Sequence, residues 1–94
     1  SIYVVIQTEE AKSEALGETT PTYGEGTVAT ADKAYEGTGI CKKAFDMTKL
    51  QVVKIAPTTK DNKKVYALKW KSDDGKTIEA DLTKNNDVKI TSKN

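Results

Sequence analysis

The C-terminal half of the sequence alternates apolar and polar residues in a pattern that fixes how three strands pair. The strands are KKVYALKWKS, KTIEADLT and DVKITS, and the turns DDG and KNN separate them. Side chains alternate between the two faces of a strand, so a slip of one residue moves each side chain to the other face. A two-residue Asp74-Gly75 turn would place Trp70 opposite Glu79. That register would mix apolar and charged groups on both faces.

A three-residue Asp73-Asp74-Gly75 turn, with Gly75 in the left-handed conformation, gives a better register. A three-residue Lys84-Asn85-Asn86 turn, with Asn86 in the left-handed position, extends the same register to the last strand. Both turns predict the same apolar face, which we expect to be core rather than a binding site: Tyr66, Leu68, Trp70, Ile78, Ala80, Leu82, Val88 and Ile90. They also predict one polar face, consisting of Lys69, Lys71, Thr77, Glu79, Asp81, Lys89 and Thr91.

The fold class predicted is mainly β, with at most one or two short helices. LQVVKIA, from residue 50, adds a strand before a PTTKDN loop, so a three- to four-stranded antiparallel meander spans residues 50–92. IYVVI at residues 2–6 has the β-branched and aromatic composition of a buried strand. We therefore expect a small antiparallel sheet that curls into a partial barrel or roll, which the N-terminal strand closes or extends.

The segment between residues 7 and 49 is less strongly patterned. TEEAKSEALG predicts either a short helix capped by Thr8 and ended by Gly17, or a loop. Residues 17–39 hold five of the six glycines and are predicted to be mainly loop, with a short strand around Val28 and a single helical turn at 31–36. Residues 40–47, ICKKAFDM, fit either a strand or a short helix.

The composition of the chain limits the classes of function that it can have. The 94 residues predict a single domain, 1–94, and one cysteine excludes an intramolecular disulfide. The chain has no histidine, and all 15 basic residues are lysines. Without histidine there is no Ser-His-Asp or Cys-His nucleophile, and without arginine there is no bidentate fork for phosphate or guanine. We expect no enzymatic activity and no cofactor.

No apolar run approaches the ~20 residues that span a bilayer, and SIYVVIQ lacks the basic lead and cleavage site of a signal peptide. We therefore expect a soluble protein without a membrane partner, located in the cytoplasm or assembled into a particle inside the cell.

Five surface lysines are candidate phosphate-binding residues: Lys42, Lys43, Lys69, Lys71 and Lys89. In Lys69-Trp70-Lys71 the predicted register places the ring on one face and the lysines on the other, which favours a core tryptophan over a base-stacking platform. Gly37-Thr38-Gly39 only weakly resembles a phosphate loop, because the spacing is short and the preceding residues are polar. Cys41 is expected to be a small buried apolar residue, and the acidic turns lack the ligand set of a metal site.

The leading functional hypothesis is a non-enzymatic structural or interaction module, an accessory subunit of a larger assembly that binds a protein partner or itself. A virion-associated decoration protein would fit this profile by analogy. Charge is unevenly distributed: residues 1–40 have seven acids and two lysines (−5), whereas residues 41–94 have seven acids and 13 lysines (+6). A dipolar molecule would support assembly, but folding that interleaves the two halves and removes the asymmetry is the favoured alternative. The alternatives are a small β-barrel nucleic-acid-binding protein, which is possible but not favoured, and an enzyme inhibitor that presents the 17–39 loop.

Overall fold

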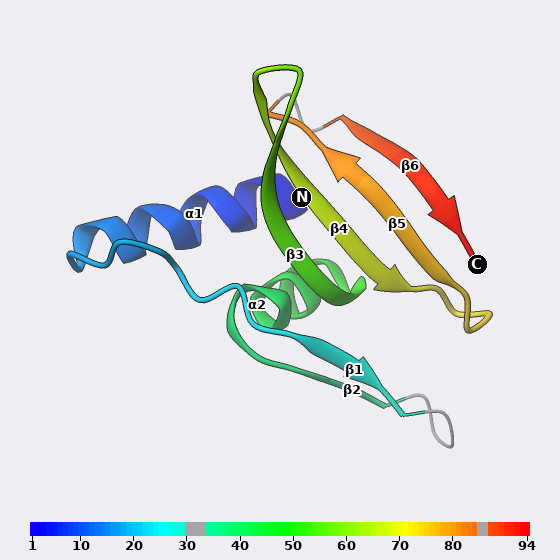
Figure 1. Cartoon of the computed structure of the whole chain (residues 1–94). Coiled ribbons are helices and arrows are strands. Elements are labelled where there is room, and N and C mark those ends of the chain that lie inside the picture. The colour runs from blue at the N-terminus through cyan, green and yellow to red at the C-terminus, as the bar shows by residue number, and fades with distance from the viewer. Residues whose placement is uncertain (30–33, 85–86) are drawn as a thin grey trace.

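The computed structural model describes residues 1–29, 34–84 and 87–94. A four-stranded antiparallel sheet carries two helices on one face, and a small two-stranded hairpin lies beside it (Figure 1). The molecule measures 40 × 30 × 18 Å. The elements in chain order are α1 (Ile2–Ala15), β1 (Gly26–Val28), β2 (Tyr35–Gly37), α2 (Gly39–Thr48), β3 (Gln51–Lys60), β4 (Lys63–Lys71), β5 (Thr77–Leu82) and β6 (Val88–Lys93).

The C-terminal meander is confirmed, with strand order β3-β4-β5-β6. Its register is also as predicted: Trp70 lies opposite Ile78 on one face, and Lys69 lies opposite Glu79 on the other. Gly75 has a φ of 82°, the left-handed conformation that the three-residue turn requires. The β5–β6 pairing follows the same pattern, with Asp81 opposite Lys89. The predicted conformation of Asn86 lies outside the described residues.

The first hairpin of the meander is longer than predicted, because β3 continues through the expected PTTKDN loop as far as Lys60. Asp61 and Asn62 alone form the turn, and both have positive φ, the pattern of a two-residue hairpin turn. Pro57 is tolerated because β3 lies at an edge of the sheet.

The N-terminal strand prediction is wrong: residues 2–6 form the first half of α1. The Ser1 hydroxyl accepts a hydrogen bond from the Val4 amide at 3.4 Å and caps the helix. Val5 and Ile6 are buried while Val4 is exposed, so this segment packs through a helical stripe and not through two strand faces. The predicted 8–17 helix is the C-terminal part of the same element.

Without an N-terminal strand, the sheet keeps two edges, β3 and β6, and the described strands do not close into the predicted barrel or roll. The short strand at Val28 is confirmed as β1, and α2 confirms the helical alternative for residues 40–47. Of the helical turn predicted at 31–36, Tyr35 and Glu36 belong instead to β2, and residues 30–33 lie outside the described part.

The core lies between the helices and the β3–β4 side of the sheet. α1 and α2 contribute Val5, Ile6, Ile40, Cys41 and Ala44, while the strands contribute Val52, Ile55, Tyr66, Leu68 and Leu82. Leu82 is the β5 member of this cluster, and no described residue of β6 belongs to it. The β6 side of the sheet therefore projects beyond the helical layer, as Figure 1 shows.

Candidate functional site

The candidate site is an exposed apolar surface at the β6 edge of the sheet. Val88 and Ile90 share the helix-facing side with the core residues, yet their side chains are 54% and 56% exposed. The prediction that these two residues belong to the core is therefore wrong. It is correct for Tyr66, Leu68, Ile78 and Leu82, which are all buried, and Trp70 is half-buried against the core. We call Trp70, Val88 and Ile90 the β6 patch.

The β6 patch opens into a recess of about 250 Å³ between the sheet and the start of α1. The recess is lined by Ser1, Ile2, Leu50, Leu68, Trp70, Leu82 and Val88. Most of these side chains are apolar, so the recess suits an apolar anchor from a binding partner better than a charged ligand.

The backbone of β6 is also available at this edge. The Thr83 amide donates to the Asp87 carbonyl at 3.1 Å, and hydrogen-bonded pairs alternate along an antiparallel ladder. By that alternation, the backbone groups of Val88 and Ile90 point away from β5. A register shift where Ser92 pairs with Glu79 then interrupts the strand as a bulge, which shortens this pairing edge.

The charges beside the β6 patch are mainly positive. Lys84 lies at the turn before β6 and Lys93 at its end, with Asp87 as the acidic residue near them, whereas Lys89 points to the open face. Lys93 pairs with Ile78 and therefore lies on the apolar side of the sheet, beyond the bulge. A partner for this surface would combine apolar side chains with negative charge.

The five predicted lysines do not form one site. Lys69, Lys71 and Lys89 lie on the open face of the sheet, opposite the helices, whereas Lys42 and Lys43 lie on α2. Lys42 pairs with Asp46 one helical turn away. The structure therefore divides the predicted set into two groups on opposite sides of the sheet.

The open face also carries acidic side chains. A shallow trough of about 270 Å³ runs between Lys54, Lys60 and Lys69, with Ala56 and Ala67 among its lining residues. Lys60 pairs with Asp81 at 2.7 Å, and Lys69 lies 3.6 Å from Glu79, as predicted. These contacts neutralise part of the positive charge that a phosphate backbone would need.

The weak phosphate-loop resemblance at Gly37-Thr38-Gly39 has a structural explanation. At the start of α2 the Ile40 amide donates to the Thr22 carbonyl at 3.1 Å, and the Cys41 amide donates to the Tyr23 carbonyl at 2.9 Å. Two of the amides that could bind an anion there are therefore occupied by the chain itself. Gly24 and Gly39 both have positive φ, and a Cβ on Gly24 would lie 2.0 Å from the Thr38 carbonyl oxygen. The two glycines therefore allow the chain before β1 to pass close to the start of α2.

Cys41 is fully buried, as predicted, and burial raises the pKa of its thiol to about 11. A thiol that remains protonated at neutral pH is a poor nucleophile. Cys41 therefore contributes to packing in this fold.

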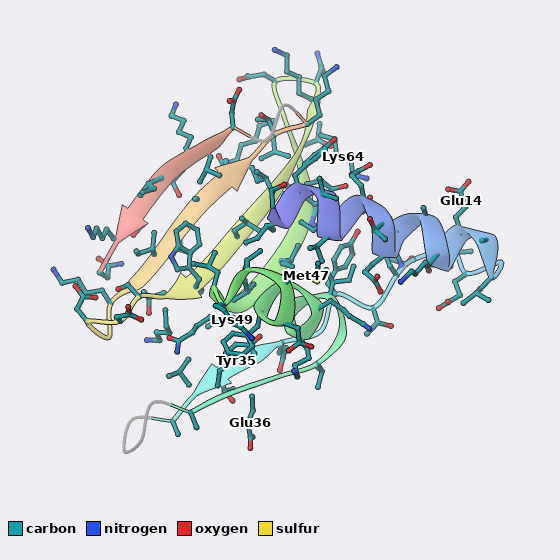
Figure 2. The ribbon with its side chains drawn as sticks, turned by 180° about the vertical axis from the view of Figure 1, so that it is seen from behind. Glu14, Tyr35, Glu36, Met47, Lys49 and Lys64 are labelled. Carbon is teal, nitrogen blue, oxygen red and sulfur yellow. The ribbon has the colours of Figure 1, made fainter. Side chains whose placement is uncertain are left out.

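A polar cluster around Glu10 fastens α1 to the rest of the molecule, and sequence reasoning did not foresee it. The Tyr23 hydroxyl donates to the Glu10 carboxylate at 2.6 Å, and the Tyr66 hydroxyl donates to it at 2.8 Å. Lys64, visible beside α1 in Figure 2, lies 3.7 Å from the same carboxylate. Burial and the Glu10 carboxylate raise the pKa values of both tyrosines. Members of the cluster come from three distant segments, so no local motif marks it.

A second cluster joins α2 to the small hairpin. The rings of Tyr35 and Phe45 stack with centroids 4.2 Å apart, and the Lys49 ammonium lies 5.5 Å from the Phe45 centroid. The Tyr35 hydroxyl donates to the Val52 carbonyl at 2.7 Å, which fixes the hairpin against β3. Figure 2 shows Tyr35 and Lys49 close together below α2. These contacts hold Tyr35, which lies in the predicted loop segment 17–39, against α2 and β3.

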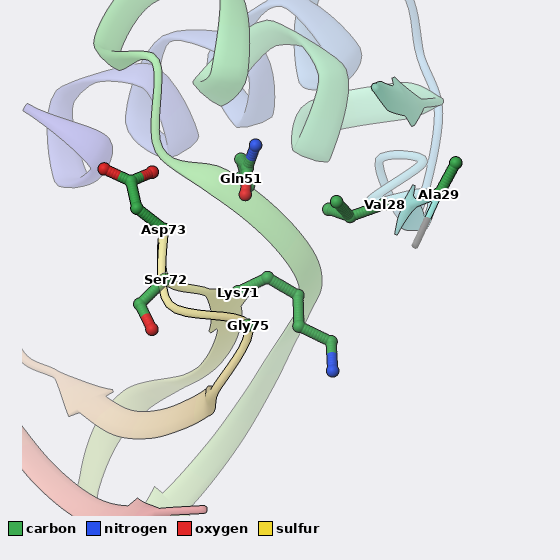
Figure 3. Close-up of a pocket in the computed structure, with 7 residues that line it drawn as sticks. All are labelled: Val28, Ala29, Gln51, Lys71, Ser72, Asp73 and Gly75. Carbon is green, nitrogen blue, oxygen red and sulfur yellow. The ribbon is translucent and has the colours of Figure 1, made fainter. Parts of the chain in front are cut away.

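A cleft of about 470 Å³ lies between the hairpin and the β4–β5 turn. Figure 3 shows its lining residues, Val28, Ala29, Gln51, Lys71, Ser72, Asp73 and Gly75. Its polar side chains are those of Gln51, Lys71, Ser72 and Asp73. Ser72 and the Lys76 amide both donate to Asp74, which lowers the pKa of that carboxyl and stabilises the turn.

Comparison with known proteins gives no assignment: no family model, curated protein or solved structure matches this chain. Within the described residues, no group of three or more metal-ligating side chains is assembled. None of the described helices has both the length and the apolar character needed to cross a membrane.

Proposed function

We propose that this protein is a non-enzymatic interaction module, an accessory subunit that binds a protein partner or a second copy through the β6 patch. The observation that carries the proposal is the exposure of Val88 and Ile90 on the core-facing side of an edge strand. Contiguous exposed apolar side chains beside an apolar recess are typical of protein interaction sites.

Burial of a valine or isoleucine side chain contributes about 1.5–3 kcal/mol, and in the free chain roughly half of that remains unused at Val88 and Ile90. A partner that covers these residues and fills the adjacent recess would recover that contribution. The absence of histidine from the sequence supports a binding role over a catalytic one.

The test is the mass of the native species in cells that express the chain. We expect the wild-type protein to run in a complex well above 10.2 kDa. A V88T/I90T variant keeps β-branched side chains but removes apolar surface, so it should run at or near the monomer mass. The matched control is K89T on the polar side of the same strand, and it should behave like the wild type. A wild-type protein that remains monomeric in the extract would contradict the proposal.

A nucleic-acid-binding function is the second candidate, because Lys54, Lys60, Lys69, Lys71 and Lys89 share the open face. The pairing of Lys60 with Asp81 and of Lys69 with Glu79 weakens the candidate. A K54Q/K71Q variant tests it by fluorescence anisotropy with a single-stranded oligonucleotide at low salt. Nucleic-acid binding predicts an affinity that falls steeply with added salt and a smaller salt slope in the variant. No binding at low salt would eliminate this candidate.

A further inference from the structure

The molecule carries a second exposed apolar and charged feature at the end opposite the β6 patch. Leu16 is the C-cap residue that follows α1, and it is 78% exposed. Glu14 and Glu18, both exposed, lie on either side of it in the sequence. We call Leu16, Glu14 and Glu18 the α1 tip.

The α1 tip projects beyond the sheet. In Figures 1 and 2 the C-terminal end of α1 lies on the far side of the molecule from β6, and Figure 2 shows Glu14 at that end. The last turn contains one basic residue, Lys12, whose ammonium is engaged by Glu9 at 3.1 Å. The carboxyl end of a helix also carries partial negative charge. Lys42 and Lys43 of α2 line the same recess as Leu16 and Glu18, and Lys42 is paired with Asp46, so the tip combines an apolar side chain with two exposed carboxylates that have lysines on one side.

This chemistry is complementary to the β6 patch. The patch presents Val88 and Ile90, and among the described residues Lys84 and Lys93, with Asp87, supply the charge near it, whereas Lys89 points to the open face. The ion pairs of the described residues involve Lys12, Lys42, Lys60, Lys64 and Lys69, and not Lys84 or Lys93, although Lys93 also interacts electrostatically with Asp74.

We propose that the α1 tip of one copy docks on the β6 patch of another, with Leu16 against the apolar surface and Glu14 and Glu18 toward the lysines. This inference rests on the proposed function and names the partner as a second copy of this chain. The two surfaces lie at opposite ends of one molecule, so the contact forms between copies. Because the two surfaces differ, such a contact is heterologous and leaves each copy a further free surface.

A symmetric β6–β6 contact fits the structure less well. It would bring Lys84, Lys89 and Lys93 of two copies along a single seam, where like charges repel. It would also need a continuous edge, and the bulge before Ser92 interrupts that edge. Charge complementarity thus favours the tip as the occupant of the patch.

Sedimentation of the purified chain tests the contact. A tip variant, L16S/E14K, and a patch variant, V88T/I90T, should each raise the dissociation constant of self-association at least about tenfold. The matched control is M47S/E36K, which removes an exposed methionine and reverses an exposed acid elsewhere on the surface. It should associate like the wild type. Added salt should weaken association of the wild type.

Mixing the two defective variants gives the decisive result. The tip variant keeps an intact patch and the patch variant keeps an intact tip, so a mixture should form a discrete 1:1 complex although neither variant associates alone. If the patch variant is impaired and the tip variant is not, the contact is symmetric and the inference is overturned. A wild-type chain that is monomeric up to about 1 mM also overturns it. The proposed function is then decided separately, by the native mass in the cell extract.

Discussion

The two edge strands of the sheet carry the same types of apolar residue on the same face but in opposite environments. On β3, Val52 and Ile55 are buried under the helices, with 0% and 3% exposure. On β6, Val88 and Ile90 are more than half exposed. The difference shows that alternation along a strand determines which face a residue occupies, whereas the neighbouring layer determines whether that face is covered.

The β3 edge is also supported by the small hairpin. Tyr35 donates to the Val52 carbonyl, and Gly26 lies so close to β3 that a Cβ there would meet the same carbonyl oxygen at 1.9 Å. Among the described elements no such support reaches β6. The covered edge thus stabilises the monomer, and we propose that the uncovered edge serves association.

The largest effect expected from this comparison is the difference between I55A and I90A. Truncation of the buried Ile55 should lower the free energy of unfolding by about 2–5 kcal/mol, because it leaves a cavity. Truncation of Ile90 should lower it by less than about 1 kcal/mol, since solvent already surrounds the side chain. Denaturant unfolding at a concentration where the chain is monomeric measures both. Equal losses would mean that β6 is covered in the monomer.

A pair of glycine variants examines the covered side through its backbone. G24A should lower the free energy of unfolding by about 2–4 kcal/mol, because its Cβ would collide with the Thr38 carbonyl in addition to the left-handed strain. G75A has similar φ but open space around it, so it should cost only the conformational penalty of about 1–2 kcal/mol. Thermal melts of the two variants compare them. If G24A lowers the free energy of unfolding no more than G75A does, the contact between Gly24 and the Thr38 carbonyl is not tightly packed.

The sequence predicted the meander more accurately than its surroundings. Gly75 and the alternating residues around it encode register locally, so the pairing of Trp70 with Ile78 could be deduced. Residues 2–6 were misread because β-branched residues favour strands, and the packing of Val5 and Ile6 against distant strands overrides that preference. The exposure of Ile90 could not be predicted, since it depends on where the helices end in space.

A smaller effect is expected where α1 is fastened to the sheet. E10Q should lower the free energy of unfolding by about 1–3 kcal/mol, because the Tyr23 and Tyr66 hydroxyls lose a charged acceptor. E14Q, on the exposed tip of the same helix, should change it by no more than about 0.5 kcal/mol. Denaturant unfolding of the monomer distinguishes the two variants. Equal effects would show that the hydrogen bonds from Tyr23 and Tyr66 to Glu10 do not stabilise the fold.

The smallest effect is a dependence on alkaline pH. The pKa values of Tyr23 and Tyr66 are raised in the folded chain, whereas tyrosines in the unfolded chain ionise near pH 10. The contribution of these hydroxyls is therefore complete below about pH 10 and is lost as the pH rises further. Thermal melts from about pH 9 to pH 12 should show a shallower decline for Y23F than for the wild type. The control Y3F, which keeps its ring against Tyr66, should retain the wild-type slope.

Trp70 fluorescence tests directly whether the uncovered β6 edge is an association surface. It is the single tryptophan of the chain, is half-buried, and shares the recess with Val88. As the concentration of the purified chain rises, we expect Trp70 emission to shift to the blue and acrylamide quenching to decrease, in parallel with the mass measured by sedimentation. A mass that rises while Trp70 emission and quenching stay constant would place the association elsewhere on the molecule and contradict the proposed role of the β6 edge.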